Sequence, residues 1–297
     1  MDTIMTKPIG HKVIVVYHSL PLSLRKLKLG VWSFHDRNLY SLVSSLTSLK
    51  DQKVIEKHCW VGCPTTKDKK LVSSENEQAT EALNIQLAEN SCIPVETVSS
   101  KLYDDAVNKF SQQFLNPLFH YDISDSTFQD SHWKSYKLFN KRFASKIAEI
   151  YQPGDIVWIH GIQLLLVPKY LRELINSCLI GFFLYCPFPA VEIYRCLASR
   201  KKILQGILGS DLVAFQSYSY SRYFIQSCTR ILGVAGGFDG VKYRQERIGK
   251  EHLTRVSVYP EGIDPLETQR SLAFQETQQR LAELKARFKD LKIFLAK

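Results

Sequence analysis

The chain has 297 residues, of which 45% are apolar and 11% aromatic, enough to bury one large core or two modest ones. No apolar run reaches the roughly 18 residues that a membrane-spanning helix needs, and the first residues lack the apolar stretch of a signal peptide. The composition therefore excludes a membrane protein and predicts a cytoplasmic globular one.

The net charge is +10, which by itself would allow binding to nucleic acid or to an anionic membrane surface. The cations, however, are spread along the chain. The densest group, residues 67–70, contains an acid, and residues 200–202 lie in a helix-like stretch where a solvated face is expected. We therefore expect no membrane partner and no main role in binding nucleic acid.

Cysteine usage indicates a reducing compartment. The seven cysteines form no C-x-x-C pair and no Cys/His cluster with the spacing of zinc ligands. We expect free thiols, mostly in the core, and neither a metal nor a cofactor. They are Cys59, Cys63, Cys92, Cys178, Cys186, Cys196 and Cys228.

Short apolar runs without alternation predict strands buried on both faces of a parallel sheet. They span residues 13–17, 156–160, 180–184, 212–215, 256–259 and 293–295. Helix-patterned stretches lie between them, at residues 165–177, 193–208, 220–232 and 274–290. Alternating strands and helices predict an α/β fold with a doubly wound, Rossmann-like parallel sheet.

Polar and charged residues dominate positions 50–90, which predicts surface loops or helices there. The glycine-rich segment 233–240 follows a helix rather than a strand, so a loop is favoured over a phosphate-binding site. Gly206 and Gly209, near the end of a predicted helix, indicate close packing or a helix cap. In the last predicted helix, Leu281, Leu284 and Phe288 share one face, and Glu276/Arg280 and Glu283/Arg287 have ion-pair spacing.

Two segments carry a resemblance to a known family. Residues 155–232, with DIVWIHGIQLLLVPKYLREL and IGFFLYCPFPAVEIYRCLASRKKILQGILGSDLVAFQSYSYSRYFIQSCTRIL, resemble trehalose-6-phosphate synthases. So do VIVVYHSLPL, CWVGCP, CIPV and FLNPLFHY before them and VYPEGIDP after them. These enzymes are GT-B glycosyltransferases with two facing Rossmann-like domains. The resemblance implies the N-terminal domain at residues 1–270. Residues 271–297 would be a junction helix and the first strand of a second domain that is otherwise absent.

The resemblance also implies a chemistry, namely transfer of glucose from UDP-glucose to glucose 6-phosphate with retention. That reaction needs an arginine on the acceptor phosphate and oriented carboxylate and imidazole groups around the sugars. This sequence departs from the family at each of these positions. Ser19 replaces the phosphate-binding arginine, Gly161 replaces an acceptor-contacting aspartate, and Tyr185 replaces the catalytic histidine.

Further departures affect both ligands. Cys63, Val107 and Asn116 replace aromatic residues that pack on the acceptor sugar, and HDRNL at residues 35–39 replaces a Gly-Gly loop for the donor phosphates. His160, Gln163 and Arg222 remain as residual cleft residues. For His160 we favour a core histidine over a catalytic one, and for Arg222 a cleft position and a helix-surface ion pair stay open. Glu192 and Arg195 indicate structural pairs or caps.

We therefore predict a non-catalytic synthase-like protein, a regulatory or structural subunit in trehalose biosynthesis. Its partners would be trehalose synthase or phosphatase subunits, with a sugar phosphate as a weak ligand. One alternative is an active synthase or a fragment of one. Another is a ligand-sensing or polyanion-binding module that reuses the fold, since a fold alone does not define a function.

Overall fold

The computed structural model describes residues 9–26, 32–36, 40–68, 70–72, 77–122, 127–244, 249, 251–262, 265–289 and 291–292. The strand expected at residues 293–295, residues 37–39 of the HDRNL segment and the side chains of His35 and Asp36 lie outside this description. Within it, no helix is long and apolar enough to cross a membrane.

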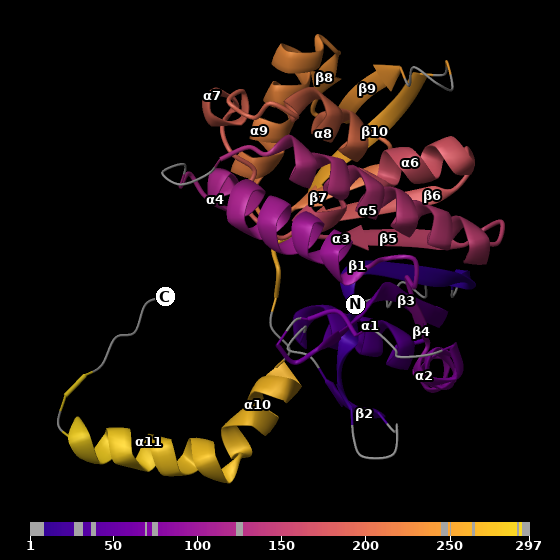
Figure 1. Cartoon of the computed structure of the whole chain (residues 1–297). Coiled ribbons are helices and arrows are strands. Elements are labelled where there is room, and N and C mark those ends of the chain that lie inside the picture. Colours follow the sequence, from indigo (N-terminus) through magenta and orange to yellow (C-terminus); the bar gives the residue numbers. More distant parts are fainter. Residues whose placement is uncertain are drawn as a thin grey trace.

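A single sheet of ten strands runs through the molecule in the order β4-β3-β1-β5-β6-β7-β10-β9-β8, with β2 paired to β1 (Figure 1). Neighbours from β4 to β10 in this order are parallel, whereas β2, β8 and β9 are antiparallel additions. The predicted doubly wound parallel sheet is thus confirmed. The strands are β1 (Ile9–Lys26), β2 (Trp32–Asp36), β3 (Ile55–Thr66), β4 (Cys92–Pro94), β5 (Ile156–His160), β6 (Leu179–Leu184), β7 (Leu212–Phe215), β8 (Gly236–Gly237), β9 (Gly240–Arg244) and β10 (Glu251–Val258).

Helices connect the parallel strands. In chain order they are α1 (Tyr40–Asp51), α2 (Glu77–Glu89), α3 (Ser100–Tyr103), the π-helix η2 (Asp104–Leu115), α4 (Asn116–Phe119), α5 (Asp130–Ile150), the 3₁₀ turn η3 (Ile162–Leu164), α6 (Val167–Leu174), α7 (Val191–Tyr194), α8 (Arg200–Ile207), α9 (Tyr218–Ser227), the π-turn η4 (Cys228–Leu232), α10 (Pro265–Ala273) and α11 (Gln275–Arg287). Strand β5 thus lies between α5 and α6, and β7 between α8 and α9, which is the expected alternation.

Two hydrophobic clusters divide the core between the faces of the sheet. The larger one joins side chains of α5, α6, α8 and α9 to β5, β6 and β7, for example Phe143, Leu171 and Phe182. The smaller one joins α1 and α2 to β1 and β3, for example Leu46, Leu87 and Trp60. Burial on both faces is therefore confirmed for the middle of β1, where residues 13–16 are all buried.

Strand β6 departs from that expectation. Its side chains alternate, with Ile180, Phe182 and Leu184 buried, Phe183 half-buried and Leu179 51% exposed. Alternation of this kind marks a strand with only one face fully packed. The prediction of burial on both faces is wrong for β6, because within the described residues the small cluster extends only as far as Trp158 of β5.

Two further predictions are corrected. Residues 50–90 contain β3, a buried strand between β1 and β4, whose apolar centre is masked in sequence by the polar residues on either side. The helix expected at 193–208 is broken into α7 and α8. Local side-chain hydrogen bonds accompany the break: Tyr194 Oη donates to the carbonyl of Arg200, at 3.1 Å, and the Arg200 guanidinium donates to the carbonyl of Leu197, at 3.1 Å.

The glycine predictions are confirmed. A methyl group on Gly206 would lie 2.5 Å from the carbonyl oxygen of Leu165, and one on Gly209 would lie 2.4 Å from the amide nitrogen of Lys169. Helix α8 therefore approaches the start of α6 more closely than a side chain at either glycine allows. The segment 233–240 follows η4 and forms the β8–β9 hairpin, as expected for a loop.

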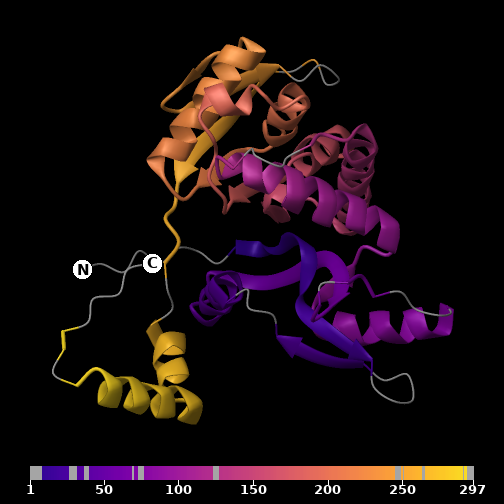
Figure 2. The ribbon, with the colours of Figure 1, turned by 60° about the vertical axis from the view of Figure 1, so that its left-hand side comes forward.

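Helices α10 and α11 stand apart from the sheet and its helices in both views (Figures 1 and 2). None of the 13 residues of α11 is buried, although Leu284 in the helix and Phe288 just after it are half-buried. The expected pairing of Glu283 with Arg287 gives way to a pair with Arg280, 2.7 Å away. The apolar stripe of α11 is therefore not part of either core cluster.

Candidate functional site

The sequence-predicted positions gather at one edge of the sheet, where the parallel strands have their carboxyl ends. Ser19 of β1 is in register with Cys63 of β3, His160 ends β5, and Tyr185 follows β6. In open α/β sheets, ligands bind outside this edge. The structure thus brings together four of the predicted positions, which come from four different strands.

Ser19 and Cys63, which the sequence resemblance places at phosphate- and sugar-contacting positions, are both buried. Ser19 is 1% exposed and Cys63 is fully buried. Burial raises the pKa of the Cys63 thiol well above its usual value, so this group is neutral. Neither side chain can present a positive charge to an anionic ligand.

His160 is fully buried and packs against Tyr185. The Tyr185 hydroxyl lies 3.2 Å from Nδ1 of His160, and the two rings are stacked with their centroids 5.7 Å apart. Burial lowers the pKa of His160 to about 3, so the imidazole is neutral at physiological pH. Its Nε2 has no hydrogen-bond partner among the described residues. A core position was expected for His160, and the structure supplies a partner for one ring nitrogen only.

Tyr185 stays protonated at physiological pH. Its pKa is raised chiefly by burial and further by the negative charge of Glu261. Glu261 follows β10 and accepts a hydrogen bond from Nε2 of Gln216, which follows β7, at 3.0 Å. Sequence reasoning missed Gln216 and Glu261, although their positions just after strands were a usable signal. Glu261 is thus a carboxylate at the same edge, but it is exposed and engaged with Gln216.

Gly161 and Gln163 come directly after His160. Gly161 has φ 93° and ψ 159°, a conformation that is essentially restricted to glycine. Gln163 belongs to η3 and is 4% exposed, and its carbonyl accepts a hydrogen bond from Nδ2 of Asn140, at 3.0 Å. Helix α5 therefore holds the main chain of η3, which follows Gly161, in place.

The remaining predicted residues lie in the helices. Val107 belongs to η2, is 3% exposed and is part of the larger core cluster, and Asn116 begins α4 and is half-buried. Arg222 is exposed on α9 with its guanidinium 5.6 Å from the ring centre of Tyr223. Glu192 forms the expected structural pair, with Arg230 at 3.2 Å. The structure does not place these residues among the groups around His160.

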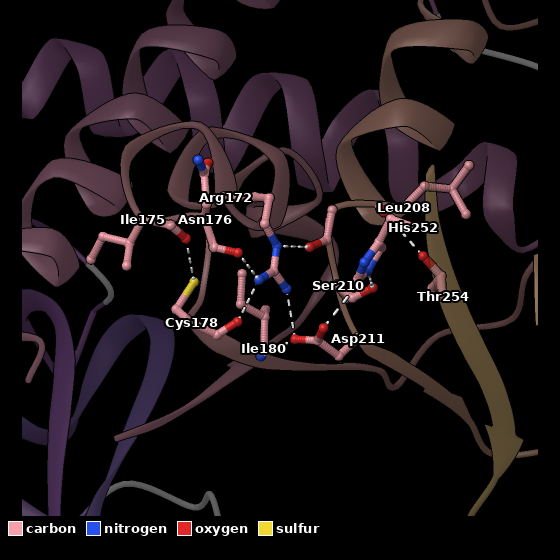
Figure 3. A network of polar contacts seen from close by, with 11 residues as sticks. Arg172, Ile175, Asn176, Cys178, Ile180, Leu208, Ser210, Asp211, His252 and Thr254 are labelled. Atoms are coloured by element: carbon pink, nitrogen blue, oxygen red, sulfur yellow. Dashed lines mark hydrogen bonds and ion pairs between the residues drawn. The ribbon is translucent and has the colours of Figure 1, made fainter. Parts of the chain in front are cut away.

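The most extensive polar network lies away from this edge (Figure 3). Arg172 of α6 is 6% exposed and donates to the carboxylate of Asp211, at 2.6 Å, and to the carbonyls of Gly209, Asn176 and Cys178. The same carboxylate oxygen of Asp211 accepts from the amide of Ile180, at 2.7 Å. Cys178 and Ile180 lie at the start of β6, and Asp211 directly precedes β7. The network therefore connects the amino ends of these two strands and stabilises their positions.

Chemically, the described residues in contact with or in register beside His160 are neutral donors and acceptors, and the carboxylate of Glu261 at the same edge is bonded to Gln216. No group of three or more potential metal ligands is present in the described part of the chain. A neutral histidine, a protonated tyrosine, a buried serine and a glycine can pack and exchange hydrogen bonds. They provide no cation for a phosphate and no free carboxylate beside a sugar.

The fold and this edge define a Rossmann-like domain of the GT-B glycosyltransferase type. Residues 11–297 match the family model of glycosyltransferase family 20. The chain belongs to this family.

Curated relatives have similar sequences over nearly all of this chain. The chain is 37% identical over 284 residues to alpha,alpha-trehalose-phosphate synthase [UDP-forming] A of Dictyostelium discoideum, covering 96% of this chain and 36% of that protein. It is 33% identical over 288 residues to alpha,alpha-trehalose-phosphate synthase [UDP-forming] 1 of Aspergillus fumigatus, covering 96% of this chain and 53% of that protein. The chain therefore spans about half, or less, of the length of these relatives.

Solved structures show the same fold. The N-terminal domain of Candida albicans trehalose-6-phosphate phosphatase superposes with a TM-score of 0.75 at 29% identity, over 98% of this chain and 57% of that one. An Escherichia coli structure, described as trehalose-6-phosphate bound with UDP-2-fluoro glucose, gives a TM-score of 0.69 at 24% identity, over 95% of this chain and 55% of that one. These matches confirm the predicted N-terminal half of a GT-B fold.

Proposed function

We propose that this chain is a non-catalytic, synthase-like protein that acts as a regulatory or structural subunit in trehalose biosynthesis. The observation that carries the proposal is the charge state of the carboxyl edge. His160 is buried and neutral, Tyr185 is bound to it, and Ser19 is sealed. These three side chains supply none of the oriented charges that glucosyl transfer to a sugar phosphate requires.

A second consideration supports a role other than synthesis. The Candida albicans structure is named as a domain of a phosphatase, not of a synthase. Domains of this fold thus occur in proteins that are named for a different activity, and a fold serves several functions. A subunit that binds a trehalose synthase or phosphatase is consistent with such reuse.

The activity test is direct. We expect the purified chain to release no UDP above background from UDP-glucose and glucose 6-phosphate, while an active synthase assayed in parallel does. Coupled detection of UDP is the measurement. Turnover that exceeds background and disappears in a His160→Asn variant would contradict the proposal, because it would assign catalysis to this edge.

An active glycosyltransferase is the alternative, either through this chain or through a longer protein of which it is a part. It is favoured by the names of the curated relatives and by the share of their length that the chain spans. The same UDP-release assay distinguishes the active synthase from the non-catalytic subunit when it is repeated with a longer gene product that contains this chain. UDP release by the extended product alone would favour the fragment interpretation.

The proposed partner surface is the apolar stripe of α11. We expect Leu284→Asp with Phe288→Asp to weaken co-purification with trehalose synthase subunits, because none of the residues of α11 is buried and both side chains are available to a partner. The melting temperature of the domain should change by less than about 2 °C, since surface substitutions cost little. Gln279→Asp with Ala286→Asp, on the opposite face of α11, is the matched control. If the stripe variant instead lowers the melting temperature while partner binding is unaffected, the stripe packs on its own domain and the surface is wrong.

A further inference from the structure

A side chain at position 161 would meet the carboxamide of Gln163. A methyl group on the Cα of Gly161 would lie 2.8 Å from Oε1 of Gln163, closer than Cβ atoms approach their neighbours, so the carboxamide would have to shift; the ring of Tyr17 would lie 3.5 Å away, at ordinary contact distance. The backbone of Gly161, at φ 93° and ψ 159°, disfavours any side chain for a second and independent reason. Two obstacles therefore act at this position, one in the backbone and one in the neighbouring carboxamide.

Gln163 cannot easily move away. The residue is 4% exposed, and η3 is held to α5 by the hydrogen bond from Asn140 to the Gln163 carbonyl and by one from Tyr136 Oη to the Ile162 carbonyl, at 2.8 Å. Dense packing resists side-chain displacement. The main chain of Gln163 is thus fixed by contacts from a different helix, and its buried carboxamide has little space to leave its place next to Gly161.

We propose that Gly161 and Gln163 form a coupled pair in which the Gln163 carboxamide fills the place of a side chain at position 161. Gln163 is then a positioning residue that keeps the β5 end of the edge closed to a sugar-phosphate acceptor. The proposal rests on the proposed function, since it explains how the non-catalytic edge is maintained. It implies that a carboxylate cannot return at position 161 by one substitution.

A double-mutant cycle tests the coupling. We expect Gly161→Ala to lower the melting temperature by about 8 °C and Gln163→Ala by about 4 °C. The melting temperature of the double variant should fall by at least about 3 °C less than the sum of the two single decreases. Removing the carboxamide removes the clash with the methyl group, although the backbone strain at position 161 remains. Gly161→Ala with Gln163→Asn, which shortens the side chain by one methylene, should show part of the same rescue.

Gly233 provides the control. It has φ 70°, and a methyl group there would meet no heavy atom within 4 Å. Gly233→Ala combined with Gln163→Ala should therefore be additive within about 1 °C. If neither double variant at position 161 is more stable than the sum of its single changes predicts, the proposal is wrong. If Gly161→Ala fails to fold and its Gln163→Ala double variant folds, the coupling is supported.

The outcome is independent of the activity assay. UDP release by the unmodified chain would overturn the proposed function and leave the coupling intact. Additive melting temperatures would overturn the coupling and leave the proposed function intact.

Discussion

Arg172→Leu should lower the free energy of unfolding by about 3 kcal/mol, the lower end of the range for breaking a buried ion pair. The substitution leaves the Asp211 carboxylate without its guanidinium, and it removes the donors to the carbonyls of Gly209, Asn176 and Cys178. We place the loss at the lower end because the Asp211 side chain is 35% exposed and water replaces part of the interaction. Urea unfolding followed by circular dichroism gives the value.

The control for Arg172 is an ion pair of the same chemistry at the surface. Arg230 and Glu192 are 60% and 68% exposed, so Arg230→Leu should cost less than about 1 kcal/mol. Arg172→Leu combined with Asp211→Leu should be less destabilised than the sum of the single changes, since no buried charge is left alone. Equal losses for Arg172→Leu and Arg230→Leu would show that the network of Figure 3 does not fasten the strands.

Back-substitution of the edge should fail. We expect the triple variant Ser19→Arg, Gly161→Asp and Tyr185→His to release no UDP and to lose about 5 kcal/mol of stability or more, enough to unfold many domains. Ser19 is 1% exposed, so an arginine there is an unpaired buried charge. Gly161 has a conformation that is restricted to glycine, and Tyr185→His removes the hydroxyl that contacts His160.

The matched control makes the same three chemical changes on the surface. Ser219→Arg, Gly262→Asp and Tyr218→His fall at exposed positions, and Gly262 has no heavy atom within 4 Å of an added methyl group. This control should stay within about 1.5 kcal/mol of the unmodified chain, because exposed substitutions each change stability by about 0.5 kcal/mol or less. A stable triple variant at the edge, or one that releases UDP, would show that the edge is less tightly built than these contacts indicate.

The local sequence pattern predicts some strands and helices of this fold and misses others. Strands β5 and β7 were predicted at their exact bounds because each is a short apolar run between turn residues. Strand β3 was missed because polar neighbours diluted its apolar centre. The α7–α8 break was missed because hydrophobic periodicity does not show the side-chain hydrogen bonds that Tyr194 and Arg200 make to carbonyls between the two helices. The predicted division at residue 270 stays a prediction.

For the candidate site, too, the sequence predicts one part and only the structure shows the rest. Its residue identities came from the sequence, whereas the pair of Gln216 with Glu261, the closure of Gly161 by Gln163 and the hydrogen bond between His160 and Tyr185 came only from the folded chain. Each of these contacts joins separate strands or depends on backbone angles. None of the three contacts is visible in spacing along the chain.

The sequence by itself determined the α/β class, the order of most strands and helices and the family, because hydrophobic periodicity and ordered motifs are local properties of a chain. Only the tertiary structure decided which side chains at the candidate site are charged and which are buried away from water. The neutral state of His160, the burial of Ser19 and the Arg172 network all depend on how distant segments exclude water from one another. Desolvation and close packing are properties of the whole fold, and at this edge of the sheet they keep His160 neutral and Ser19 buried.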